Sequence, residues 1–197
     1  MSLLRAEGLC VYRGDRRLLA DFALDLGRGE LLHLRGPNGI GKTSLLETLA
    51  GLRPVREGRV QRPPQEAGVH WLGHRNGLSL QLSPRENLQD WCGFSLGDAD
   101  RVPAVLERLG LPPRARLRPC RLLSAGQKRR TALARLLLVP RPLWLLDEPL
   151  DGLDAAGLSL FAELATAHLD QGGAVLMTSH QPLPAGLAAR ASERVLS

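Results

Sequence analysis

The hydrophobic and polar positions of the first fifty residues predict strands, one glycine loop and one helix. Residues 3–12 predict a strand that ends at a turn, and residues 22–26 alternate apolar and polar side chains as a half-buried strand does. The apolar run 31–34 predicts a buried strand, and residues 44–50 have the apolar spacing of a helix. A glycine-rich segment separates this strand from this helix.

The next segment contains turn residues and two further strand signals. Residues 51–68 are rich in glycine and proline and predict a loop, with a short strand around residues 58–60. Residues 69–74 predict a strand with a polar tip.

Helical spacing dominates the middle third of the chain. Ser83, followed by Pro84 and Glu86, is typical of a capped helix start. Residues 102–109 and 125–139 predict helices that stop at glycine or proline. We therefore expect a single domain over residues 1–197, with a helical subdomain over about 76–139 inserted in an α/β core.

The last third returns to α/β order. Residues 143–146 predict a buried strand, and the two acids Asp147 and Glu148 follow it directly. A helix is predicted over 158–168 and a strand over 174–178. After that strand we expect no further domain.

Composition is typical of a soluble globular protein, with 44% hydrophobic and 23% charged residues. We find no signal-peptide pattern and no apolar run near the roughly 20 residues that span a bilayer. Three scattered cysteines argue against disulfides or zinc and fit a reducing cytoplasm. The net charge of +6 leaves nucleic acid, anionic lipid and acidic partners open, but the arginines are dispersed, so we prefer a generally basic composition.

The glycine-rich segment fits the phosphate-binding pattern G-x-x-x-x-G-K-[ST]. In this pattern backbone N–H groups and the helix N-terminus surround phosphate oxygens, the lysine reaches the β- and γ-phosphates, and the hydroxyl binds Mg²⁺. Only two lysines occur among the 26 basic residues, and one of them is in this segment. An ordinary glycine turn with a solvated lysine is the alternative. The segment consists of Gly36, Pro37, Asn38, Gly39, Ile40, Gly41, Lys42 and Thr43, and Ser44 follows it.

The two acids after residues 143–146 complete this chemistry. Asp147 is placed to hold Mg²⁺ through water, and Glu148 is placed to accept a proton from an attacking water. Tyr12 has a ring that can stack on a nucleotide base, although an ordinary strand aromatic explains it equally well.

The run Leu123-Ser124-Ala125-Gly126-Gln127 narrows the class. The chain resembles the ATP-binding-cassette (ABC) ATPases, whose L-S-G-G-Q-like signature opens a helix between the phosphate loop and the acidic strand. The resemblance implies a P-loop NTPase fold with a RecA-like core, an antiparallel β subdomain and an inserted helical subdomain. It also implies a head-to-tail homodimer that sandwiches two ATP molecules. Ser124, Gly126 and Gln127 would then face the partner's γ-phosphate.

Other positions match the family one at a time. Tyr12 matches the adenine-stacking aromatic, Glu148 the catalytic base and His180 the switch histidine. Asp154 matches the loop that contacts the other subunit, although Asp151-Gly152 stands before Leu153 where the family usually has Ser-Ala. His74 occupies the position of a glutamine that binds Mg²⁺ and senses the membrane partner. We treat His74 as a coupling residue and, with Thr43 and Asp147, as a candidate metal ligand, although histidine is a poor direct ligand for Mg²⁺.

Softer features resemble one subfamily, the CcmA ATPase subunits of bacterial cytochrome c maturation. They are the small size, Trp71-Leu72-Gly73-His74 with Gly77-Leu78 after it, Arg129-Arg130 after the signature run, the Leu-rich helix to Leu138, and Ser179-His180-Gln181-Pro182-Leu183. This resemblance implies coupling of ATP hydrolysis to haem export or to release of a haem chaperone. It also implies a peripheral location on the cytoplasmic face of the inner membrane, with a CcmB-like permease subunit and CcmC-, CcmD- and CcmE-like proteins.

Three alternatives remain. The ATPase of another small exporter, for a lipid or a drug, would use the same mechanism. A soluble cassette protein acting on nucleic acid would usually carry a second cassette, coiled coils or zinc inserts, and none is visible, so no nucleic-acid partner is expected. A phosphate-loop kinase would leave residues 123–127 and His180 unused.

Overall fold

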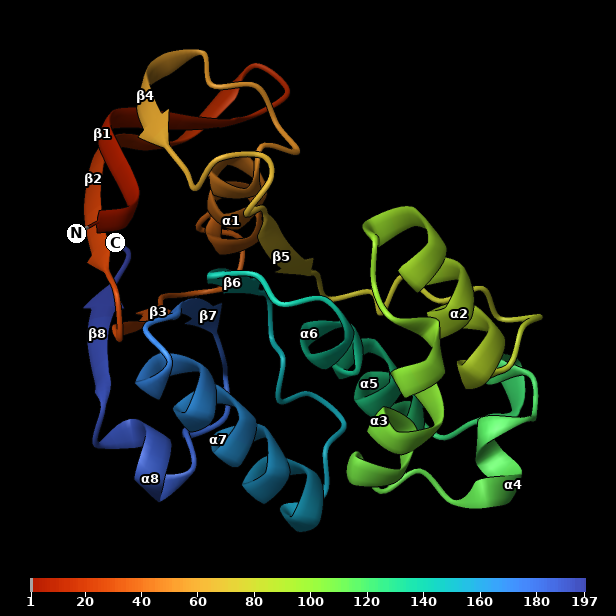
Figure 1. Cartoon of the computed structure of the whole chain (residues 1–197). Coiled ribbons are helices and arrows are strands. Elements are labelled where there is room, and N and C mark those ends of the chain that lie inside the picture. The colour runs from red at the N-terminus through yellow and green to blue at the C-terminus, as the bar shows by residue number, and fades with distance from the viewer. Residues whose placement is uncertain (1) are drawn as a thin grey trace. The chain divides into compact units, whose positions relative to one another are not determined.

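The computed structural model describes residues 2–197, and it divides into two compact units (Figure 1). The first unit contains the chain up to Gly73, Arg141–Pro149 and Ala162–Ser197. The second contains His74–Pro140 and Leu150–Phe161.

A three-stranded antiparallel sheet with the order β2-β1-β4 begins the first unit. The three predicted strands are confirmed, but the second is longer than expected. A tight turn at Gly14-Asp15 pairs Arg13 with Arg16, so hydrogen bonding starts immediately after the turn. The strands are β1 (Ser2–Arg13), β2 (Arg16–Gly27) and β4 (Glu57–Gln61).

A five-stranded sheet with the order β5-β6-β7-β3-β8 forms the centre of the first unit, and every pairing is parallel. Leu146 pairs with Met177, and Leu34 pairs with Thr178, so three neighbouring strands end at the same edge. The predicted strand over 69–74 is two residues too long, because its partner β6 already ends at Leu146. The strands are β3 (Leu31–Arg35), β5 (Val69–Leu72), β6 (Leu143–Leu146), β7 (Ala174–Thr178) and β8 (Ala191–Val195).

The edge strand β8 was not predicted from the sequence. It follows the short helix α8 (Ala185–Ala188) and pairs with β3 from Leu31↔Ala191 to Arg35↔Val195. Its five residues are all exposed or half-buried, and their sequence lacks the apolar run that marks the inner strands.

The core of the first unit lies between its two sheets. Helix α1 (Lys42–Ala50) contributes Leu45, Leu46 and Leu49, all completely buried, to a cluster that includes side chains from both sheets. Figure 1 shows α1 on one face of the parallel sheet and α7 (Ala155–Asp170), of which residues 162–170 belong to this unit, on the other.

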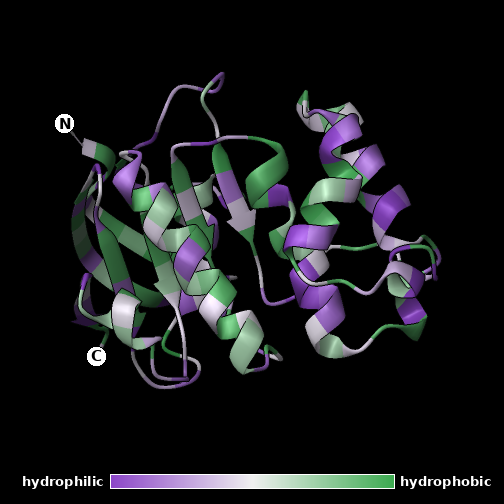
Figure 2. Cartoon of the chain, turned by 60° about the horizontal axis from the view of Figure 1, so that its bottom comes forward, coloured by the Kyte–Doolittle hydropathy of each residue, from purple (hydrophilic) through white to green (hydrophobic). Residues whose placement is uncertain are grey.

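The second unit is helical, as expected. The predicted cap is confirmed: the Ser83 hydroxyl accepts from the Glu86 N–H, and the Glu86 carboxylate accepts from the Ser83 N–H. Figure 2 shows hydrophilic and hydrophobic residues along the same helices, as amphipathic helices have. The elements are α2 (Pro84–Ser95), η1 (Ala99–Arg101), α3 (Val102–Arg108), α4 (Pro113–Arg116), η2 (Cys120–Leu122), α5 (Ala125–Leu133) and α6 (Arg135–Leu138).

The prediction of one helix over residues 125–139 was wrong in detail. The segment divides at Ala134 into α5 and α6, and Val139 is extended. Ala134 keeps helical dihedrals, but its carbonyl accepts from the N–H groups of both Leu137 and Leu138, which tightens the turn. Val139 is extended because Pro140 disfavours a helical residue before it.

Two features bear on expectations from composition. Cys10, Cys92 and Cys120 are buried, and none of them forms a disulfide. Among the helices of residues 2–197, none combines the length and apolar character needed to cross a membrane.

An aromatic pair fixes α7 against β6 within the first unit. The rings of Trp144 and His168 stack with centroids 3.9 Å apart and planes 8° from parallel. Burial lowers the pKa of His168, since the charged imidazolium is poorly solvated there.

This burial predicts a pH dependence of folding. Below about pH 6.5, the usual histidine pKa, His168 takes up a proton in the unfolded state more readily than in the folded state. The contribution of neutral His168 to the free energy of unfolding is therefore complete above about pH 6.5 and is lost as the pH falls below it. His168→Phe keeps a stacking ring and removes the titration. Urea unfolding at pH 8 and pH 5.5 should show a smaller loss of unfolding free energy in the variant, and an equal loss would contradict the assignment.

Candidate active site

The loop Gly36–Thr43 connects β3 to α1 in the first unit. Gly41 caps α1 with a left-handed φ of 116°. Gly36 has a φ of 148°, and a Cβ there would lie 2.8 Å from the Leu196 carbonyl oxygen. Backbone conformation and close approach therefore both require glycine at these positions. The loop ends at the N-terminus of α1, where backbone N–H groups are available to bind an anion.

Lys42 lies within this loop. Its ammonium donates to the carbonyl of Gly36 at 2.7 Å and to that of Pro37 at 3.2 Å, and the residue is only 9% exposed. The positive charge is thus held at the loop rather than in solvent, which argues against the reading as an ordinary glycine turn.

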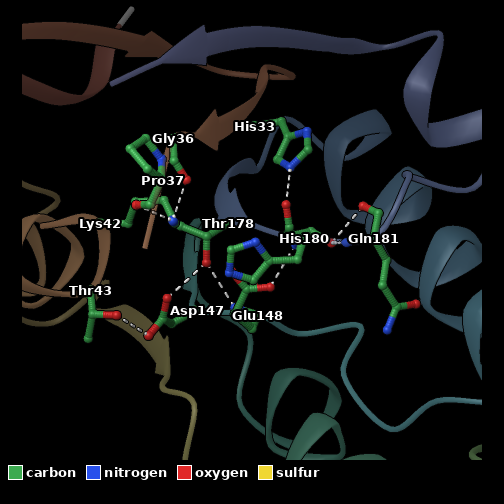
Figure 3. Close-up of polar contacts among 11 residues, drawn as sticks. His33, Gly36, Pro37, Lys42, Thr43, Asp147, Glu148, Thr178, His180 and Gln181 are labelled. Carbon is green, nitrogen blue, oxygen red and sulfur yellow. Dashed lines mark hydrogen bonds and ion pairs between the residues drawn. The ribbon is translucent and has the colours of Figure 1, made fainter. Parts of the chain in front are cut away.

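Asp147 connects the loop to the edge of the sheet. The Thr43 hydroxyl donates to its Oδ2 at 2.8 Å, and the Thr178 hydroxyl donates to its Oδ1 at 2.8 Å (Figure 3). Asp147 is 2% exposed, so these hydrogen bonds compensate for burial of the carboxylate.

The Thr178 hydroxyl also accepts from the backbone N–H of Glu148 at 2.9 Å. One buried hydroxyl therefore fixes both acids. Glu148 itself has a φ of 51°, in the left-handed region that a residue other than glycine rarely adopts. Such a conformation costs on the order of 1–3 kcal/mol and is typical of functional positions.

His180 lies beside Glu148 (Figure 3). Its backbone N–H donates to Glu148 Oε2 at 2.9 Å, and its ring Nε2 is 3.5 Å from Oε1. The Glu148 side chain is 9% exposed and that of His180 54%, so the acid is sheltered while the imidazole reaches solvent.

Tyr12 lies on β1 of the same unit. Its hydroxyl donates to the Glu57 carboxylate, which raises the pKa of Tyr12. The guanidinium of Arg56 covers the ring at 5.2 Å from its centroid. The ring is held by groups on the β4 side and stays partly exposed.

In the second unit, Ser124 caps α5. Its hydroxyl accepts from the Gln127 N–H, and the Gln127 side chain accepts from the Ser124 N–H, both at 3.1 Å. A Cβ on Gly126 would lie 2.7 Å from the Gly152 carbonyl oxygen. The signature segment therefore packs directly on the segment that precedes Asp154.

Asp154 is fixed to the same helix. It accepts hydrogen bonds from the Gly157 N–H at 2.8 Å and from the Arg130 guanidinium, and both lower its pKa. His74 is exposed and follows β5. Near it, Asn76 accepts from Arg129 at 2.9 Å through its side chain and from Arg135 at 3.2 Å through its carbonyl.

The donor set at the loop suits Mg²⁺. The Thr43 hydroxyl and the Asp147 carboxylate lie 2.8 Å apart, and both are the hard oxygen donors that this ion prefers. These two residues could therefore hold a divalent ion.

The structure brings together five predicted residues of the first unit: Lys42, Thr43, Asp147, Glu148 and His180. It places His74, Ser124, Gly126, Gln127 and Asp154 in the second unit. Sequence reasoning missed Thr178, although its place at the end of a buried strand next to Ser179-His180 was a usable signal.

Residues 19–151 match the family model described as ABC transporter. The chain belongs to the ABC transporter family. As the ATP-binding subunit of that family it is an ATPase, and the expected fold class is confirmed.

Similar proteins agree with this assignment. The ABC subunit is 49% identical to the cytochrome c biogenesis ATP-binding export protein CcmA of Rhodobacter capsulatus, over 91% of this chain and 82% of that protein. A putative ABC transporter ATP-binding protein from Pyrococcus furiosus, 21% identical, shares the fold with a TM-score of 0.81 over 98% and 96% of the chains. A dimeric ATP-binding cassette in a post-hydrolysis state bound to ADP and Pi, 22% identical, gives a TM-score of 0.78 over 90% and 88%.

We predict that Thr178→Val damages this ABC site. The substitution keeps the shape but removes the hydrogen bonds that Thr178 makes with the Glu148 N–H and with Asp147 Oδ1, which should cost about 1–3 kcal/mol of stability. Turnover should fall by at least about tenfold, because both acids lose their common support. The matched control is Thr48→Val, whose hydroxyl only donates to the Ser44 carbonyl within α1. Equal ATPase rates in the two variants would contradict the prediction.

Proposed function

We propose that this chain is the ATP-hydrolysing subunit of a membrane ABC complex in cytochrome c maturation. Hydrolysis would be coupled to haem export or to release of the haem chaperone. The observation that carries the catalytic part is the buried connection from Thr43 through Asp147 and Thr178 to Glu148. The similarity to the CcmA protein of Rhodobacter capsulatus supports the pathway.

The first step is nucleotide binding by the loop. The N–H groups between Gly36 and Thr43 would hold the phosphates, with Ser44 beside them at the start of α1. The Lys42 ammonium would exchange its two carbonyl partners for β- and γ-phosphate oxygens. Tyr12 would stack on adenine, since its ring is already fixed by Arg56 and Glu57.

Mg²⁺ is the proposed cofactor beside ATP. The Thr43 hydroxyl would bind it directly and Asp147 through water. When bound, the ion neutralises the charge that develops on the phosphates. His74 takes the place of the family glutamine, and its exposed position suits a coupling residue better than a direct ligand.

Glu148 is the proposed base. Its Oε2 accepts from the His180 N–H, and its Oε1 would accept the proton of the attacking water. The His180 ring, 3.5 Å from that oxygen, would contact the γ-phosphate and keep the water aligned. Since Glu148 and His180 are fixed before substrate arrives, little reorganisation is needed in the transition state.

We further propose that two copies close over two ATP molecules. The N-terminus of α5, capped by Ser124 and carrying Gly126 and Gln127, would bind the γ-phosphate held by the partner copy, since helix N-termini attract anions. Asp154 would face the partner across the same interface. Both units would serve one ATPase domain over residues 1–197, with residues 76–139 as its helical subdomain.

The proposed partners are a CcmB-like integral subunit and CcmC-, CcmD- and CcmE-like proteins. The chain would be peripheral, on the cytoplasmic face of the bacterial inner membrane. A nucleic-acid partner is not part of this proposal.

We predict that Glu148→Gln abolishes turnover while ATP binding remains. Loss of the base should lower kcat by on the order of a hundred- to ten-thousandfold. Because bound ATP is then not hydrolysed, the ATP-bound dimer should accumulate and be visible by light scattering. Lys42→Ala should instead weaken ATP binding. The control is Glu163→Gln, an exposed position on α7. Hydrolysis at the native rate in Glu148→Gln would refute the assignment of the base.

The pathway has its own test. Deleting the gene in the organism that encodes it should abolish c-type cytochromes, measured as covalently bound haem on denaturing gels, while b-type cytochromes remain. The native gene should restore them, and the Glu148→Gln gene should not. Normal c-type cytochromes in the deletion strain would exclude the proposed pathway without affecting the ATPase assignment.

A further inference from the structure

A buried histidine lies in the strand that leads to the phosphate loop. His33 belongs to β3, is 3% exposed, and is opposite Met177 of β7 and Glu193 of β8. The buried strand positions around it are leucines. A polar ring in such a strand costs free energy unless its nitrogens are satisfied, so its contacts are informative.

One ring nitrogen of His33 has a hydrogen-bond partner, and the other lies near a carboxylate without a hydrogen bond. Nε2 is 3.2 Å from the carbonyl oxygen of Ser179, and Nδ1 is 3.5 Å from Oε1 of Glu193. The other oxygen of Glu193 is 3.3 Å from the Arg35 guanidinium. With a carbonyl on one side, the ring must donate through Nε2 to satisfy this contact. Glu193, itself held by Arg35, lies on the opposite side of the ring.

The carbonyl that His33 contacts belongs to the peptide group between Ser179 and His180. The N–H of that same peptide group donates to Glu148 Oε2 at 2.9 Å (Figure 3). A peptide group is planar, so fixing its carbonyl also fixes the direction of its N–H. His33 and Glu148 are therefore connected through a single rigid plane.

The chain after this peptide group is also closed on itself. The Ser179 hydroxyl donates to the Gln181 carbonyl at 2.8 Å and lies 3.0 Å from the Gln181 N–H. That turn holds the segment on its C-terminal side. The Ser179 carbonyl, on the other side, is held by the His33 ring.

We propose that His33 is a positioning residue for ATP hydrolysis. It orients the Ser179–His180 peptide group so that its N–H holds the Glu148 carboxylate in the direction of the attacking water. His33 touches neither nucleotide nor water and acts through Glu148, so the inference depends on the proposed role of Glu148 as base.

A cavity beside the ring makes the test feasible. It has a volume of about 340 Å³ and is lined by residues that include His33, His180, Leu183 and Glu193. Side chains of similar or smaller size can replace His33 there without overpacking the sheet.

The experiment compares three variants of the full chain by steady-state ATPase kinetics. His33→Leu removes the donor and should lower kcat by about ten- to a hundredfold, the effect of a small displacement of a catalytic group. KM for ATP should change by less than about twofold, since no phosphate contact is altered. His33→Gln, whose amide reaches the position of Nε2, should recover most of kcat. His33→Asn, whose amide reaches only the Nδ1 side, should not.

A double variant separates this inference from the proposed function. If His33 acts through Glu148, adding His33→Leu to Glu148→Gln should lower the residual rate no further. Native turnover in Glu148→Gln would refute the base itself. An inactive Glu148→Gln with a native rate in His33→Leu would overturn only the role of His33.

The folding of the variants separates a positioning role of His33 from a purely structural one. If His33→Leu fails to fold, the comparison of Gln with Asn at position 33 still gives the answer. Equal kcat values in these two variants, or a loss of activity that follows their thermal stability, would show a purely structural histidine and overturn the proposal.

Discussion

The parallel register of β6, β7 and β3 is the constraint on which the site depends. Leu146 is opposite Met177, and Thr178 is opposite Leu34, so the residues that follow the strands meet at one edge of the sheet. The loop Gly36–Thr43, the two acids and His180 all start from this edge. In an α/β protein this is where ligands bind, because polar groups can gather there without entering the core. A shift of one residue between any two strands would separate these groups.

At that edge the protein holds its proposed catalytic acid in an unfavourable backbone conformation. The left-handed φ of Glu148 is maintained by two hydrogen bonds, one from its N–H to the Thr178 hydroxyl and one from the His180 N–H to its carboxylate. Thr178 is the last residue of the buried strand β7, and His180 follows it by two residues. The strain is thus supported by the sheet, which fits a base that must be oriented before the substrate binds.

In the second unit, a departure from the family pattern has a local explanation. Gly152 replaces the usual alanine and adopts a φ of 76°, while its carbonyl lies against Gly126 of the signature segment. Two glycines facing each other let the backbones approach closely. Arg130 then connects the same helix to Asp154. The signature and the loop after the acids are therefore held together by backbone contact and one ion pair.

The sequence by itself determined the inner strands, the capped helices, the phosphate loop and the identity of the acids. These follow from apolar periodicity and from residues that act with their neighbours in the chain, such as Ser83 with Glu86. It did not determine β8, because an exposed edge strand has no apolar run, nor the division at Ala134, which differs from a continuous helix by one tightened turn. It also did not reveal Thr178 or His33 as parts of the site. Thr178 contacts Glu148, 30 positions away, and His33 contacts Ser179, 146 positions away. Only the tertiary structure decides such contacts, because strand order and register, not local spacing, bring the partners together.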